Sequence, residues 1–169
     1  QVRDYVGFDI VPGDNVAVVG DAHELSRHFG AGRFDVVYSD WVFEHLLMPW
    51  KVVVEANRVL KVGGELFITT NHSIGLHDLP WDFWRFSDTC WHGLLNEATG
   101  FEIVEARLGD PVRVTPMRYH SGFREHEGGL GFQASTVWAR KIAETALSWD
   151  VPAAGLFAKL SRAYPKEAK

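Results

Sequence analysis

Short apolar runs of strand length alternate along this chain with segments of helical periodicity. The runs are rich in β-branched and aromatic residues, which favour strands. Six of them predict strands, at residues 5–10, 16–19, 34–38, 65–70, 101–107 and 132–141. This alternation is typical of an α/β fold, in which helices cover both faces of a mostly parallel sheet. The long connection 109–131 between the last two runs predicts an antiparallel edge strand.

The segments between these runs predict helices with recognisable ends. Helical spacing of apolar residues covers 22–29, 49–62 and 87–99. Pro49 suits a first helical turn, and Gly63-Gly64 predicts the end of the second helix. Ser87 is a plausible N-cap for the third. Residues 71–86, dense in histidine and tryptophan, predict a loop.

Composition bounds the class of protein. With 169 residues, of which 46% are hydrophobic, the chain can bury the core of one domain. A net charge of −5 argues against a nucleic-acid-binding surface. No run approaches the roughly 18 apolar residues that span a bilayer. A single cysteine, Cys90, cannot form an internal disulfide, and we expect a cytoplasmic protein.

Two stretches, FDVVYSDWVFEHL at 34–46 and NRVLKVGGELFITTN at 57–71, form a distinctive series. The series resembles the class I, Rossmann-like S-adenosylmethionine-dependent methyltransferases, in particular their small-molecule branch, over residues 4–141. The resemblance implies a three-layer α/β fold. It also implies transfer of a methyl group to an oxygen, nitrogen or carbon atom of a small-molecule acceptor, with S-adenosylhomocysteine as product.

The resemblance also implies cofactor contacts after two early strands, where an open α/β sheet binds its ligand. Asp9, followed by Ile10, matches the acidic residue that binds the ribose hydroxyls. Asp21 and Ala22 match the position that holds the adenine amino group. From the residues alone, Asp9 could instead belong to a turn, and Asp21 could cap the following helix.

The turn after the FDVVY strand matches the part of the family that lines the methionine end of the cofactor. It holds Ser39, Asp40 and Trp41. Core packing is the alternative for Trp41. Asp40 is also the first of three residues that could bind a cation. Glu44 lies four residues further on, and His45 is adjacent to Glu44. Our prediction is no metal site, with Asp40, Glu44 and His45 as the alternative cation ligands.

The loop after the fourth matched strand often covers the substrate in this family. Its HDLPWDFWRFS text resembles methyltransferases of sugar and cell-surface polysaccharide pathways. The predicted substrate contacts are Glu44, Asn71, Trp84 and Arg85. A histidine could act as general base, His72 first because it follows the strand directly, and His45 second. The alternative is an aromatic plug that packs the end of the sheet.

The family's glycine-rich turn after its first strand has no counterpart here, since only eight residues precede Asp9. We therefore expect a domain at 1–141 that lacks that strand and helix, followed by a helical extension and tail at 142–169. Cofactor binding is expected to be weak or absent. Unpaired strand edges favour a homodimer. The rival hypothesis is a non-catalytic, oligomerising α/β module that has lost cofactor binding.

Overall fold

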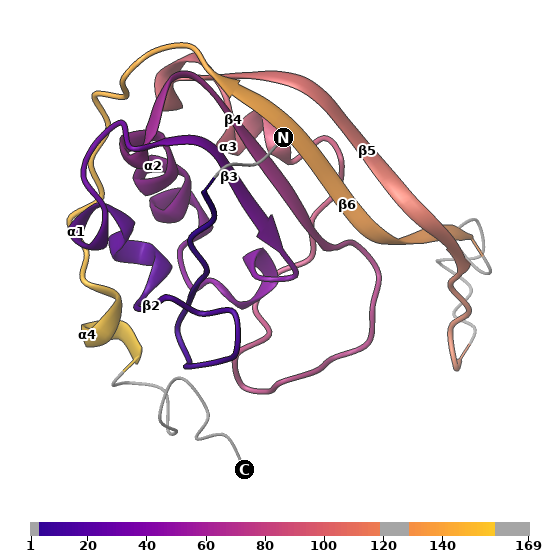
Figure 1. Ribbon diagram of the computed structural model, residues 1–169. Helices are drawn as coiled ribbons and strands as arrows, with labels where there is room; N and C mark the ends of the chain where they lie inside the picture. Colours follow the sequence, from indigo (N-terminus) through magenta and orange to yellow (C-terminus); the bar gives the residue numbers. More distant parts are fainter. Residues whose placement is uncertain (1–3, 119–128, 158–169) are drawn as a thin grey trace.

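The computed structural model describes residues 4–118 and 129–157, and its strands form two sheets (Figure 1). The larger sheet has the order β3-β4-β6-β5. Its strands are β3 (Phe34–Asp40), β4 (Leu60–Asn71), β6 (Leu130–Lys141) and β5 (Phe101–Arg113). The smaller sheet pairs β1 (Phe8–Asp9) with β2 (Val18–Val19) in parallel. Within the described residues, β3 pairs with a strand on one edge only.

The α/β fold with a mostly parallel sheet and an antiparallel strand is confirmed. β3 and β4 are parallel, and β6 is antiparallel to both β4 and β5. The antiparallel strand lies inside the sheet, however, and not at its edge as predicted. The reason is that β5 and β6 form a hairpin whose second strand inserts beside β4, where Val137 and Ala139 are fully buried.

Helices are shorter than the sequence predicts. The α-helices are α1 (Leu25–His28), α2 (Pro49–Val59), α3 (Trp91–Leu94) and α4 (Ala153–Phe157). The 3-10 helices are η1 (Ala22–Glu24), η2 (Phe43–His45) and η3 (Glu97–Thr99). The helix predicted at 87–99 divides because Leu95 is extended and Asn96 starts a new turn, accepting hydrogen bonds from the N–H groups of Ala98 and Thr99.

The predicted end of the second helix at Gly63-Gly64 is wrong. α2 ends at Val59, and β4 begins at Leu60. The pairing of β3 with β4 jumps from Phe34–Leu60 to Val36–Glu65, so the two glycines lie in an irregular stretch of the strand. Gly63 has a φ of 85°, a value that favours glycine.

A hydrophobic core lies between the sheet and α2 and α3. Fully buried members include Val53, Ile68, Trp91 and Val137. Trp91 stacks on Phe86 at a centroid distance of 5.0 Å. Its indole N–H donates to Ser135 Oγ at 2.8 Å, so the buried polar group is satisfied.

Residues 142–157 return from β6 along α2. Asn57 Nδ2 donates to the carbonyls of Thr99 and Ala143, and Lys51 Nζ donates to the carbonyl of Val151. A boundary at residue 141 stays a prediction. Residues 158–169 of the predicted extension, and 119–128 of the predicted irregular connection, lie outside the described residues. No helix in the described ranges is long and apolar enough to cross a bilayer.

Candidate functional site

Asp9 and Asp21 lie just at or after the ends of β1 and β2, as predicted. Asp9 Oδ1 accepts a hydrogen bond from the N–H of Val11 at 2.9 Å, which closes a turn beside Ile10. Asp21 caps η1, because its Oδ1 accepts from the N–H of His23 at 2.9 Å, and Ala22 follows as the first residue of that helix. The turn and cap contacts are therefore present, and they leave cofactor contacts by both carboxylates as predictions.

His23 joins Asp21 to the start of α2. Its ring is fully buried, with Nδ1 2.6 Å from Asp21 Oδ1 and Nε2 accepting from the N–H of Met48 at 3.1 Å. The Met48 contact requires a lone pair on Nε2, so Nδ1 carries the proton and donates it to Asp21. Burial raises the pKa of Asp21, and the hydrogen bonds from His23 outweigh it, so that the pKa falls below its ordinary value of 3.8.

The turn after β3 has an unusual backbone, and its residues Asp40 and Trp41 are exposed. Ser39 and Asp40 end the strand, and Trp41 follows with a φ of 52°, a left-handed conformation rare for a tryptophan. The N–H of Trp41 donates to the carbonyl of Thr69, which ties the turn to β4. Trp41 is 40% exposed, so the ring is available to a ligand rather than packed in the core.

Asp40 does not join Glu44 and His45. The backbone at Trp41 is left-handed, and the 3-10 helix η2 begins only at Phe43, so the i and i+4 spacing of an α-helix does not apply. The group that comes together is Glu44, His45 and His77, each offering one ligand atom within 4.8 Å of the others. The sequence alone gave no reason to select His77, because its partners lie more than 30 positions earlier.

The loop 71–86 docks onto η2 through its backbone. The N–H groups of Phe83 and Trp84 both donate to the carbonyl of Glu44, at 2.9 and 3.2 Å. The indole N–H of Trp84 donates to the carbonyl of Leu46 at 2.8 Å. Trp81 is buried, as expected for an aromatic plug, whereas Trp84 remains 37% exposed.

Arg85 holds this loop closed. Its guanidinium donates to both carboxylate oxygens of Asp82, at 2.5 and 2.8 Å, and to the carbonyls of Ile74, Gly75 and Trp84. The hydrogen bonds from Arg85 lower the pKa of Asp82 to about 2, against the opposing effect of burial. These contacts occupy the guanidinium within the loop, so its predicted role with an acceptor anion has no support in the geometry.

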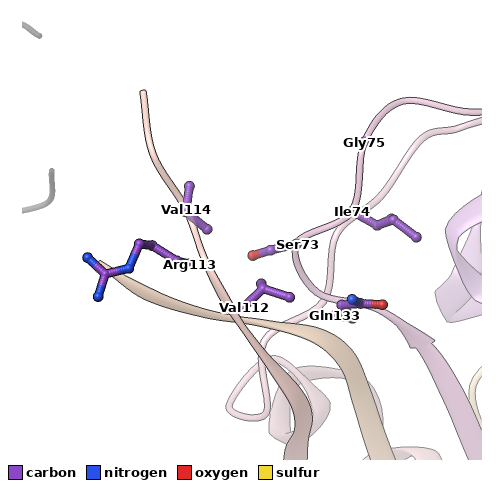
Figure 2. Close-up of a pocket in the computed structure, with 7 residues that line it drawn as sticks. All are labelled: Ser73, Ile74, Gly75, Val112, Arg113, Val114 and Gln133. Atoms are coloured by element: carbon purple, nitrogen blue, oxygen red, sulfur yellow. The ribbon is translucent and has the colours of Figure 1, made fainter. Parts of the chain in front are cut away.

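His72 directly precedes Ser73 in the chain, and Ser73 is one of the residues that line an open cavity of about 510 Å³ (Figure 2). Its Nδ1 is 2.7 Å from Ser73 Oγ and 3.2 Å from the carbonyl of Phe132. The cavity is lined by Ser73, Ile74, Gly75, Val112, Arg113, Val114 and Gln133. In Figure 2 the Ser73 hydroxyl points toward β5, whereas Arg113 extends away from the cavity. Asn71, the last residue of β4, is fully buried.

The comparisons with known proteins agree with this fold. Residues 4–68 match the family described as "Methyltransferase domain". A comparison with curated proteins found no match.

Solved structures of similar fold come from several organisms. A candidate methyltransferase of Bacillus halodurans is 20% identical with a TM-score of 0.58, over 82% of this chain and 83% of the other. A SAM-dependent methyltransferase of Archaeoglobus fulgidus is 17% identical with a TM-score of 0.59, over 80% and 75%. The 1,6-didemethyltoxoflavin-N1-methyltransferase of Burkholderia thailandensis, solved with S-adenosylhomocysteine, is 19% identical with a TM-score of 0.54, over 80% and 60%. At such identities the likeness shows the fold.

Proposed function

We propose that this chain takes part in methyl transfer to a small-molecule acceptor. Residues 4–68 match the methyltransferase-domain family, and the fold is similar to that of solved S-adenosylmethionine-dependent methyltransferases. The observation that carries the proposal is the cavity at the carboxyl end of β4. This is the edge at which an open α/β sheet binds its ligands. The family match ends at residue 68, three residues before the end of β4 and five before Ser73, the first residue that lines the cavity.

Cofactor binding is assigned to residues at or just after the ends of three strands, β1, β2 and β3. Asp9 would hold the ribose, Asp21 the adenine, and the turn from Ser39 to Trp41 the methionine end. Asp21 suits this task because its lowered pKa keeps it ionised, and an ionised carboxylate accepts hydrogen bonds from amino groups. The exposed ring of Trp41 offers a flat apolar surface that would contact the methionine end of the cofactor.

His72 is our candidate for the general base. Both Nδ1 neighbours, Ser73 Oγ and the carbonyl of Phe132, can accept a hydrogen bond, which favours the tautomer protonated at Nδ1. That tautomer leaves a lone pair on Nε2, as proton removal from an acceptor hydroxyl requires.

The enzyme's main contribution is to align acceptor, methyl group and sulfur. The sugar-pathway resemblance of the loop makes a sugar hydroxyl our first choice of acceptor, and a cytoplasmic location stays our expectation.

Calorimetric titration with S-adenosylhomocysteine tests the cofactor part of the proposal. We expect weak but saturable binding that the Asp21→Ala substitution abolishes, with Asp14→Ala, an exposed aspartate, as the matched control. Micromolar affinity would contradict the expected weakness. Identical titrations for the wild type and Asp21→Ala would contradict the assigned contact.

A turnover assay tests the other part of the proposal, methyl transfer to an acceptor with His72 as general base. The chain is incubated with labelled S-adenosylmethionine and a panel of sugars, phenols and amines, and methylated products are detected by mass spectrometry. His72→Gln should lower turnover by about 100-fold, within the usual contribution of a general base, and leave cofactor affinity unchanged. Full activity of His72→Gln would overturn its role. Absence of both cofactor binding and turnover on every acceptor would favour the non-catalytic module that has lost cofactor binding.

A further inference from the structure

We propose that Glu44, His45 and His77 bind one divalent transition-metal ion, of which zinc is the best candidate. The three residues join η2 to the loop 71–86, outside the contacts assigned above to cofactor and general base. One ligand atom from each lies within 4.8 Å of the others, so small side-chain rotations bring all three onto one ion.

The hydrogen bonds of the two histidines orient their other ring nitrogens as ligands. His45 Nδ1 lies 2.6 Å from the carbonyl of Trp81, and His77 Nδ1 lies 3.1 Å from the carbonyl of Gly75. A carbonyl accepts only from a protonated nitrogen, so each ring carries its proton on Nδ1 and keeps a lone pair on Nε2. A backbone carbonyl on the second ring nitrogen is the usual support of a metal-bound histidine.

A hydrogen bond also orients the side chain of Glu44. Its side chain is 1% exposed, and Oε2 accepts from the hydroxyl of Thr70 at 2.5 Å. Oε1 lies on the other side, 3.9 Å from His45 Nε2. The two rings are 4.9 Å apart at an interplanar angle of 80°. One carboxylate oxygen and two imidazole nitrogens therefore converge from two segments of the chain.

The local charge favours a cation. Glu44 and Asp82 are two buried carboxylates, and the guanidinium of Arg85 forms its ion pair with Asp82. Arg85 also interacts electrostatically with Glu44, but one guanidinium cannot neutralise both charges. Buried charge is costly unless it is paired or binds a metal, and a divalent ion supplies the missing compensation.

Asn71 provides an independent sign of a missing ligand. Its side chain is fully buried, and Oδ1 has no hydrogen-bond partner among the described residues. The amide nitrogen of the same side chain donates to the Nε2 lone pair of His77 at 3.4 Å, a long hydrogen bond that binding of an ion at Nε2 would replace. A water bound to the ion could donate to this oxygen and complete a four-coordinate site. Two histidines and one carboxylate with an open position form a known zinc ligand set, whereas magnesium and calcium prefer oxygen ligands.

Metal loading tests the proposal without cofactor or acceptor. The protein is stripped with a chelator, reloaded with Zn²⁺ or Co²⁺, and freed of excess metal. We expect one ion per chain by elemental analysis, and visible Co²⁺ absorption typical of low coordination number. Thermal unfolding should shift upward with added Zn²⁺, because the ion binds the folded state.

Variants assign the ligands. His77→Ala, at a side chain 33% exposed, should weaken zinc affinity by about 100-fold or more and leave the far-ultraviolet circular dichroism unchanged. His92→Ala, an exposed histidine on α3, is the matched control and should bind as the wild type does. Glu44→Gln should also lose the ion. Absence of saturable binding by the wild type, or equal binding by His77→Ala, would overturn the proposal.

Discussion

Lys141, at the end of β6, donates a hydrogen bond of 2.8 Å from its ammonium group to the carbonyl of Leu60, the residue that follows α2. The same ammonium donates to the carbonyl of Asn57 at 2.6 Å and to Glu144 at 2.8 Å. Its side chain is fully buried. A buried cation thus satisfies carbonyls that the helix end leaves free and fixes where α2 stops.

Replacement of Lys141 by methionine should destabilise the fold by about 3 kcal/mol, because buried carbonyls lose their charged donor. Urea unfolding followed by tryptophan fluorescence measures the difference. Lys61→Met is the matched control, since Lys61 is half exposed and pairs with the exposed Asp35, and its change should stay below about 1 kcal/mol. Equal effects of the two substitutions would contradict the capping role.

The Thr70 hydroxyl supports Glu44, and Thr70→Val tests that contact. The substitution preserves side-chain shape but leaves a buried carboxylate oxygen without its donor. We expect a loss of about 1–3 kcal/mol in the free energy of unfolding. Thr69→Val, on the neighbouring and partly exposed position of β4, is the control and should cost clearly less. A larger effect at Thr69 would show that the Glu44 contact contributes little.

The charge of Asp21 should make stability depend on pH. Its folded-state pKa lies below the ordinary 3.8, so its ionised form contributes stability above about pH 4. That contribution disappears as the pH falls through the folded-state pKa. Asn in its place still accepts the His23 hydrogen bonds but cannot ionise.

Urea unfolding at pH 7, 5 and 3 tests this dependence. The wild type should exceed Asp21→Asn in stability at pH 7 and 5, and the gap should narrow at pH 3. Asp14→Asn, at an exposed position, should show no comparable change. A gap that widens toward pH 3 would mean that the folded state raises the pKa of Asp21.

Local sequence pattern accounts for most of the fold. The FDVVY and ELFITT runs lie in β3 and β4, and the run at 132–141 lies in β6, because β-branched runs bounded by turns specify strands. The end of α2 could not be predicted in this way. It depends on Lys141, more than 80 positions away, whereas Gly63-Gly64 supplied a stronger local signal at the wrong place.

The candidate site was predictable in part for the same reason. Asp9, Asp21 and residues 39–41 lie at or just after the ends of strands, and strand ends can be predicted from the sequence. The proximity of Glu44 and His77 could not be predicted from the sequence. It requires the left-handed backbone at Trp41 and the loop conformation that the hydrogen bonds of Arg85 stabilise. The family resemblance also suggested an acceptor contact for Arg85, but resemblance does not reveal that Asp82 occupies its guanidinium.

The free edge of β3 predicts self-association. Among the residues that the structure describes, β3 is an outermost strand of the larger sheet, and Val36 and Tyr38 on it are 50% and 65% exposed. An apolar strand with an unpaired edge readily pairs with another chain. We therefore expect a homodimer in light scattering. Val36→Lys should shift it toward monomer, because a lysine on an edge strand opposes pairing, whereas Val62→Lys, at an exposed position of β4, should not. A wild type that stays monomeric at all concentrations would contradict the pairing, and an unchanged dimer in Val36→Lys would move the contact to another surface.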